Sequence, residues 1–228
     1  MDAIALGGLP LLRLLQLASP ALPLGAFAYS QGLESAVSLG WVQDERSAAE
    51  WIGGSTARAL SGVDVPILAR TYEAWRADDT AAVRRWSETL HACRESRELL
   101  EEERHLGRSM ARLLAGLELR AAAEWVEAET AALAPLLALA AVHFEVPLVA
   151  AGLAYAYARV ESQVTAASRL IPLGQLSSQR VLSRVLGTLP DVVATGLDVE
   201  DDDIGTSAPA QSIASALHER QYTRLFRS

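Results

Sequence analysis

Residues 135–170 read PLLALAAVHFEVPLVAAGLAYAYARVESQVTAASRL, and this apolar stretch does most to indicate the fold. Pro147 interrupts it, and because proline lacks the N–H that a helix interior needs, the stretch predicts two buried helices. Small residues at 150–158 would let a neighbouring helix approach closely. Sustained alternation of apolar and polar residues is missing from the sequence, as are Asn-Gly and Asp-Gly hairpin signals. The predicted fold is therefore all-α.

Helix-start signals divide the chain on both sides of this stretch. Asp44, Asp64 and Asp79 each precede a run of helically spaced apolar residues, and Asp is a favoured N-cap residue. We expect one domain over residues 1–228, a bundle of about ten helices with an extended N-terminal loop and a C-terminal tail. Further helices are expected at 94–117, 119–133 and 175–186. Outside the packed helices we expect a flexible N-terminus at 1–10, an acidic loop at 197–210 and an interaction tail at 219–228.

The helix expected at 94–117 has an apolar stripe and a charged face. On the charged face, Glu101 can pair with Arg97 and Arg104, and a charge run of this kind is usually exposed to solvent. The stripe consists of Leu99, Leu106, Met110, Leu113 and Leu117.

Composition excludes several classes of function. The formal net charge is −8, whereas nucleic-acid-binding surfaces are basic, so we expect no nucleic-acid partner. All 20 basic residues are Arg, so the chain lacks the lysine of a Walker A loop, a Schiff base or an S-x-x-K site. His91 and Cys93 lie two residues apart, which on a helix turns their side chains about 200° from each other, and the remaining histidines are isolated. We expect no metal site.

A cytoplasmic protein without a membrane span is expected. Cys93 is the only cysteine, which excludes an intramolecular disulfide and fits a reducing compartment. Residues 1–4 are acidic where a secretory signal would be basic. The longest apolar run, 131–142, contains Pro135 and is shorter than the ~20 residues of a membrane span.

Residues 19–34 read SPALPLGAFAYSQGLE and are too apolar for an ordinary solvated linker. Pro20 and Pro23 prevent a helix that ends near residue 18 from continuing, and Gly25 can take a left-handed conformation. Two interpretations remain, a helix–helix corner with buried aromatic residues and a docking surface. The tail at 219–228 interleaves arginines with large apolar groups, so it either packs on its own domain or becomes ordered when a complex forms.

Five blocks in register resemble the UreF family of urease accessory proteins. The first is segment 19–34, which is similar to the pattern S-P-x-L-P-x-G-[aromatic or small]-x-x-S-x-G-L-E. The others are ACRESREL at 92–99 with EER at 102–104, RLIPLGQ at 169–175, DIG at 203–205 and HERQYTRLFRS at 218–228. Together they extend from about residue 11 to residue 228 in the family's order.

The resemblance implies a non-catalytic, all-α urease maturation factor. Such a protein is usually a homodimer that bridges the accessory protein UreD, also called UreH, to the GTPase UreG, and the complex delivers nickel to the urease apoprotein. It implies no cofactor for this chain, since the complex handles nickel and the partner binds GTP.

The resemblance also implies roles for individual residues. Tyr155 and Tyr157 are expected near the dimer interface, and Arg169, often Lys in the family, is expected to modulate the GTPase. No catalytic residue is expected. The partner-binding residues are expected to be Phe27, Tyr29, Ser30, Glu34, His218, Tyr222, Arg224 and Phe226.

Two alternatives stand beside this interpretation. Residues 28–32, AYSQG, are one substitution from a G-x-S-x-G elbow, so Ser30 is a candidate nucleophile of a small helical serine hydrolase. Such an elbow needs a preceding strand, and none is expected here. The second alternative is a helical structural protein unrelated to nickel.

Overall fold

The computed structural model describes residues 7–206 and 208–228, and these residues form helices and connecting loops without a strand. The all-α prediction is confirmed. Of the N-terminus expected to be flexible, residues 1–6 lie outside the described part, whereas residues 8–10 begin the first helix. The α-helices are α1 (Gly8–Leu17), α2 (Leu33–Ser38), α3 (Glu45–Ala59), α4 (Val65–Arg76), α5 (Thr80–Ala92), α6 (Arg97–Gly116), α7 (Leu133–His143), α8 (Leu148–Leu170), α9 (Gln175–Leu186), α10 (Leu189–Leu197) and α11 (Pro209–His218).

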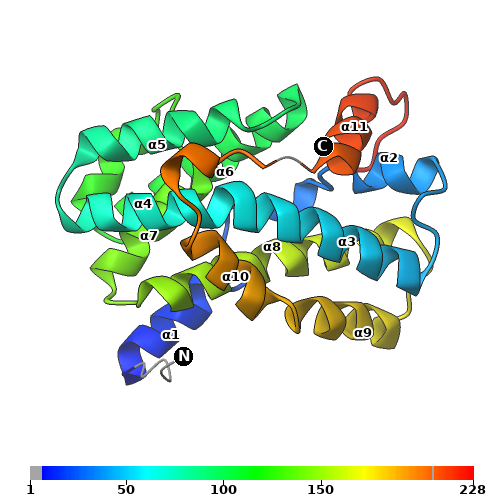
Figure 1. The fold of residues 1–228 in the computed structure, drawn as a ribbon, viewed down its shortest axis with the longest axis horizontal. Helices are drawn as coiled ribbons and strands as arrows, with labels where there is room; N and C mark the ends of the chain where they lie inside the picture. The colour runs from blue at the N-terminus through cyan, green and yellow to red at the C-terminus, as the bar shows by residue number, and fades with distance from the viewer. Residues whose placement is uncertain (1–6, 207) are drawn as a thin grey trace.

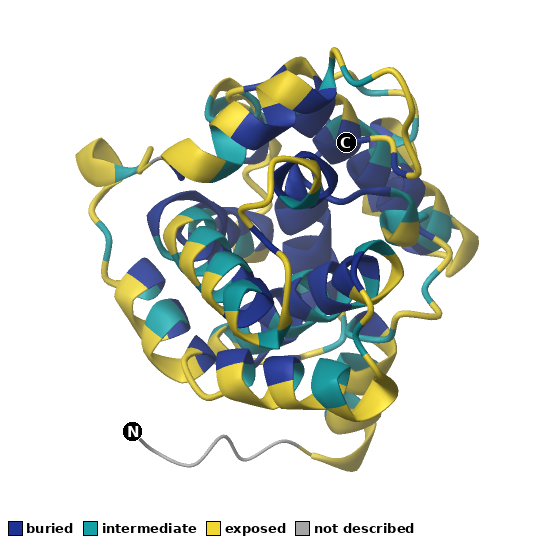
Figure 2. Ribbon diagram, turned by 90° about the vertical axis from the view of Figure 1, so that its right-hand side faces the viewer, coloured by how far each residue is buried: buried dark blue, intermediate teal, exposed yellow. Residues whose placement is uncertain are grey.

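The core is centred on α7, which packs against α4, α6 and α8 (Figure 1). Residues 133–141 of α7 are buried on every side, as expected for a helix without a polar face. Trp75 of α4 donates its indole N–H to the Pro135 carbonyl at 2.8 Å, and its ring meets Trp125 edge-on at 5.9 Å. Buried faces turn inward around this centre (Figure 2).

A π-helical turn, Leu60–Asp64, joins α3 and α4 into one continuous helix. Pro66 has no N–H to donate to the Gly62 carbonyl, and Gly205 donates to that oxygen instead at 3.0 Å. A side chain at residue 62 would collide with Thr206. The expectation that Asp64 starts a separate helix is wrong, because the helix continues through it and its side chain makes no cap.

The small residues of α8 bring it close to α10 of the same chain. A Cβ on Gly152 would lie 3.0 Å from a methyl group of Val193. Ala150, Ala151 and Ala154 are likewise buried within the chain. The stripe predicted to accept a neighbouring helix is therefore largely covered from inside.

Some of the expected helices differ from those in the structure. Asp44 and Asp79 are confirmed as N-caps, accepting from Ser47 N at 2.8 Å and Ala82 N at 2.9 Å. The helix expected at 119–133 is wrong, since only a 3₁₀ segment, η3 (Arg120–Trp125), precedes an irregular stretch. The backbone at 131–132 lies directly against Gly107 of α6, where a Cβ would collide with it, and Ala132 is extended just before α7 begins.

The loop expected at 197–210 is a connection between α10 and α11 that contains the 3₁₀ segment η4 (Asp201–Asp203). Arg70 of α4 donates from Nε to Asp201 at 2.8 Å, which fixes the loop to the long helix. None of the described helices combines the length and the hydropathy needed to span a membrane.

Candidate functional site

The N-terminal loop and the C-terminal tail lie side by side over α6. Two backbone hydrogen bonds join them, from Arg227 N to the Ala28 carbonyl at 2.8 Å and from Ser30 N to the Ser228 carbonyl at 2.9 Å. The Ser30 hydroxyl donates to the same Ser228 oxygen. As expected, Gly25 is left-handed (φ 80°), and α1 ends at Leu17 before the proline-rich stretch. The tail is thus packed on its own domain, which is the first of the two interpretations given for residues 219–228.

Gly32 allows α11 to reach this junction. Its φ of 82° is left-handed, and a Cβ there would lie 2.8 Å from the Ser215 nitrogen at the end of α11. Ser215 in turn shares a 2.7 Å hydrogen bond with Ser96, the N-cap of α6. Through these contacts α2, α6 and α11 meet at one point.

A buried imidazole bridges two carboxylates at this point. His218 Nδ1 lies 2.7 Å from Glu98 Oε2, and His218 Nε2 lies 3.1 Å from Glu34 Oε2. His218 thus joins Glu98 of α6 to Glu34 of α2 through its two ring nitrogens. Glu34 also accepts from the backbone N–H groups of Leu225 at 2.7 Å and Phe226 at 2.9 Å, which holds the tail.

The second cluster is centred on the buried carboxylate of Glu102, which connects the loop, the tail and α8. It accepts from Gln31 Nε2 at 2.6 Å, Ser228 Oγ at 3.0 Å and Arg159 Nη1 at 3.2 Å. Burial raises the pKa of Glu102, and the Arg159 charge and these hydrogen bonds oppose the rise.

The third cluster holds Arg94 between two carboxylates. Its Nη2 lies 2.5 Å from Asp64 Oδ1 and 2.6 Å from Glu103 Oε2. Glu103 also accepts from the Leu133 N–H at 2.7 Å, which ties it to the start of α7. Burial opposes ionisation of Glu103, but the guanidinium groups of Arg94 and Arg159 keep its pKa below the ordinary value of 4.5.

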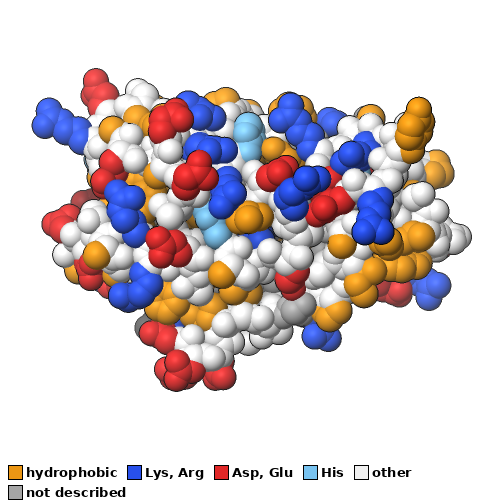
Figure 3. Space-filling model, turned by 90° about the horizontal axis from the view of Figure 1, so that it is seen from above, with side chains coloured by type: hydrophobic (Ala, Val, Ile, Leu, Met, Phe, Trp, Pro, Cys, Tyr) orange, Lys and Arg blue, Asp and Glu red, His pale blue; other side chains and the backbone are white. Residues whose placement is uncertain are grey.

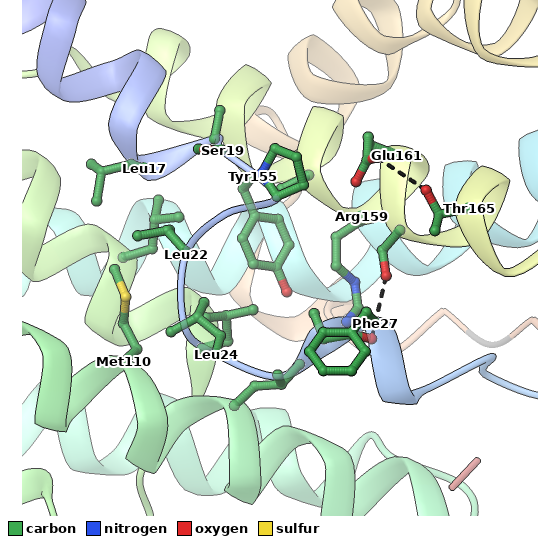
Figure 4. Close-up of a pocket in the computed structure, with 18 of the residues that line it drawn as sticks. Leu17, Ser19, Leu22, Leu24, Phe27, Met110, Tyr155, Arg159, Glu161 and Thr165 are labelled. Atoms are coloured by element: carbon green, nitrogen blue, oxygen red, sulfur yellow. Dashed lines mark hydrogen bonds between the residues drawn. The ribbon is translucent and has the colours of Figure 1, made fainter. Parts of the chain in front are cut away.

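A cavity of about 350 Å³ opens beside these clusters (Figure 4). Leu22, Leu24 and Met110 lie toward one end, and Arg159 and Phe27 lie toward the other. The wall also includes Tyr155, whose hydroxyl is buried without a hydrogen-bond partner among the described residues, and Arg169. Three residues singled out from the sequence, Phe27, Tyr155 and Arg169, therefore meet at one cavity.

The structure divides the remaining predicted residues by exposure. Phe27, Tyr222, Arg224 and Arg169 are exposed, and Tyr157 is half-buried beside α1. Buried within the chain are Tyr29, Ser30, Glu34, His218, Phe226 and Tyr155. In this conformation the residues of the second group lie beneath the surface and pack within the chain. The predicted partner contacts of both groups stay predictions.

The hydrolase alternative meets an unsuitable geometry at Ser30. Its side chain is fully buried, and its hydroxyl bonds to Ser228 O and Glu34 N, with no imidazole in hydrogen-bond reach in the described structure. No group of three or more His, Cys, Asp or Glu side chains in residues 7–206 and 208–228 is arranged to hold a metal ion.

Sequence reasoning missed the buried acids of α6. The charge run of this helix was expected to be exposed to solvent, yet Glu98, Glu102 and Glu103 within it are buried. A signal was present, because Glu98 and Glu102 continue the i, i+4 spacing of Leu106 and Met110 toward the start of the helix. The Arg97–Glu101 pair is confirmed at 3.8 Å, whereas Leu117 of the expected stripe is exposed and Leu114 is buried in its place.

Comparison with known proteins gives a consistent result. A sequence model described as UreF matches residues 42–186. The chain is 47% identical over 221 residues to the urease accessory protein UreF of Alkalilimnicola ehrlichii, with 97% of each chain covered. It is 46% identical to the proteins of that name from Chromohalobacter salexigens, over 100% of this chain and 96% of the relative, and from Pseudomonas putida strain W619, over 96% and 98%. The alignment with the Chromohalobacter salexigens protein covers the N-terminal loop and the tail.

Proposed function

The chain belongs to the UreF family of urease accessory proteins, and from this premise we propose that it is a non-catalytic urease maturation factor. It bridges a UreD/UreH-type protein and the GTPase UreG while nickel enters the urease apoprotein. The observation that supports this role is the meeting of the first, second and last sequence blocks at one junction, through Glu34, Glu98 and His218.

A bridging role suits this junction because it is built from both ends of the sequence. Phe27 is 63% exposed and Tyr222 is fully exposed, while Glu34 holds the backbone of the tail beneath them. Exposed aromatic groups on a fixed backbone are typical anchors of protein interfaces, because little entropy is lost when they bind.

The same proposal assigns the chemistry to the partners. UreG binds GTP, the complex handles nickel, and this chain has no cofactor or catalytic residue of its own in the cytoplasm. We propose that Arg169 influences the GTPase, and its exposure at the end of α8 and on the cavity wall supports this proposal.

We also propose that the protein is a homodimer that uses α1 and the groove beside it. Leu9, Leu12 and Leu15 of α1 are 64%, 63% and 59% exposed, and Tyr157 lines the adjoining apolar groove. A contiguous apolar surface of this kind is typical of an interface. We expect Leu12→Glu to halve the mass measured by light scattering, with Ile213→Glu on α11 as the exposed control. A wild-type monomer at micromolar concentration would contradict the dimer.

The maturation role is tested by adding the gene back to cells that carry the other urease genes but lack this one. We expect wild type to restore nickel content and activity of urease and to co-purify with the UreD-type and UreG-type proteins. Phe27→Ala with Tyr222→Ala should lose both effects, whereas Leu176→Ala, which removes an equally exposed apolar side chain from α9, should not. Normal nickel loading without the gene, or no captured partner, would contradict the proposal.

A further inference from the structure

The outer face of α6 carries a row of arginines without acidic partners. Arg104, Arg108 and Arg112 follow one another at a spacing of four, which places them on one stripe of the helix. None of the three forms an ion pair within the described residues, and the Nε of Arg104 is buried without a hydrogen-bond partner there. Arg112 donates only to the hydroxyl of Ser109, at 3.1 Å.

The tail adds a fourth arginine to this row. Arg227 is held beside the N-terminal loop by its backbone bond to Ala28, and the next loop residue, Tyr29, places its ring 5.9 Å from that of His105 on α6. Burial lowers the pKa of His105, and the charges of Arg227, Arg112 and Arg108 lower it further. The nearest acid on the row, Glu101, lies 3.8 Å from Arg97.

Three arginines on one stripe of α6 and a fourth on the adjoining tail stand out on a chain whose net charge is −8. Like charges without acidic partners repel one another, and this repulsion is relieved when an anionic surface covers them. Figure 3 shows the face above α5, α6 and α11, where many Arg side chains reach the surface together with His side chains, and Asp and Glu side chains lie among them. Two exposed apolar groups, Phe27 and Leu225, lie within two residues of the Arg227–Ala28 hydrogen bond.

We propose that Arg104, Arg108, Arg112 and Arg227, here called the basic cluster, dock a carboxylate-rich segment of a partner protein whose apolar side chains contact Phe27 and Leu225. The inference rests on the proposed bridging function and names the chemistry of the partner surface. A protein segment fits better than a nucleic acid, because the acidic remainder of the chain would repel a long polyanion, whereas a short segment covers only the cluster.

The test compares two double charge reversals of equal net charge. Arg108→Glu with Arg112→Glu changes the basic cluster, and Arg58→Glu with Arg184→Glu changes exposed arginines on α3 and α9. Binding of each variant to purified UreD-type and UreG-type proteins is measured at low and high salt, after circular dichroism and melting show that both are folded. Arg108→Gln with Arg112→Gln provides a milder change at the same site.

We expect the cluster reversal to weaken binding to one partner by roughly tenfold or more, the Gln pair to weaken it less, and the control reversal to change it by less than about twofold. Wild-type binding should fall with salt, and the cluster reversal should flatten that dependence. Equal effects of the two reversals on partner binding would overturn the docking role of the basic cluster and leave the bridging function intact. If the wild-type protein binds neither partner, both the bridging function and the docking role of the basic cluster are overturned. If the basic cluster binds only an oligonucleotide, the proposal of a protein partner at the cluster is overturned.

Discussion

Arg224 in the tail donates from Nη1 to Oε1 of Glu98 in α6 at 2.7 Å, across 126 residues of sequence. The other oxygen of Glu98 contacts His218, so one buried carboxylate holds two side chains of the C-terminal segment. The Arg224 side chain is still 40% exposed, which leaves part of its guanidinium group facing solvent. Arg224 therefore has two roles to test, its internal hydrogen bond to Glu98 and its exposed guanidinium surface. Measuring stability and binding on one substitution separates them.

We expect Arg224→Ala to lower the free energy of unfolding by only about 1 kcal/mol, because Glu98 keeps its contact with His218. Binding to the partners should weaken by about 1–3 kcal/mol if the exposed part of the guanidinium donates to them. Urea denaturation and a binding titration measure the two effects. Arg220→Ala, an exposed neighbour without an ion pair in the described structure, is the control, and equal binding by both variants would remove Arg224 from the interface.

His218→Ala should be more damaging. It removes the imidazole that joins Glu34 and Glu98, which leaves the first buried carboxylate with only the N–H groups of the tail and the second with only Arg224, at a cost of about 3 kcal/mol. We expect a large fall in the urea midpoint, compared with a small change for His143→Ala, which removes an exposed histidine from α7. Equal midpoints would show that the bridge adds nothing to stability.

Removal of residues 219–228 should both lower the melting temperature and abolish partner capture. The truncation exposes the pocket of Phe226, which is 5% exposed, and takes the Ser228 hydroxyl from Glu102 and two N–H donors from Glu34. Calorimetry and co-purification on the same protein measure the two effects. An unchanged melting temperature would show that the packing of the tail contributes nothing to the fold.

The lowered pKa of Glu103 predicts that the free energy of unfolding depends on pH. Its pKa in the folded protein is below 4.5, so its contribution is present above pH 4.5 and is lost as the pH falls through the lower folded value. Glu103→Gln should lower the free energy of unfolding by about 3 kcal/mol at neutral pH, because it leaves Arg94 with one carboxylate. The difference from wild type should shrink in acid. Glu88→Gln, at an exposed position of α5, should show no such convergence.

Arg169→Ala should leave folding and assembly unchanged, since the side chain is exposed and has no ion pair in the described residues. GTP hydrolysis by UreG in the reconstituted complex is expected to change. Arg184→Ala on α9 is the matched exposed arginine. The same turnover in all three complexes would remove Arg169 from control of the GTPase.

Local signals in the sequence predicted the helices well, because they act within one turn of the chain. Asp44 and Asp79 mark helix starts through hydrogen bonds to residues three positions later, and Pro147 separates α7 from α8. The helix predicted after Leu119 is wrong for the opposite reason. Its conformation depends on contact with Gly107, which local propensity does not contain.

The site was predicted in outline and missed in its interior. The blocks at both ends of the chain do meet, but the charged groups that join them are far apart in sequence, as in His218 with Glu34. A Glu is ordinarily assigned to solvent, and only its distant partner shows that it is buried. The i, i+4 spacing from Leu106 could have indicated that Glu102 is buried. Its partners Gln31, Arg159 and Ser228, however, come from three other segments of the chain.

The turn at Leu60–Asp64 acts as a one-residue phase shift within the longest helix. Before it, α3 packs against α9 and α8, and after it, α4 packs against α7 and α5. If the same five residues formed regular α-helix instead, everything that follows would be rotated by about 100°. That rotation would carry Trp75 away from the Pro135 carbonyl and Asp64 away from Arg94. The wide turn therefore sets which neighbours each half of the helix faces, because it takes up one residue and leaves α4 in the orientation that a regular helix one residue shorter would give it.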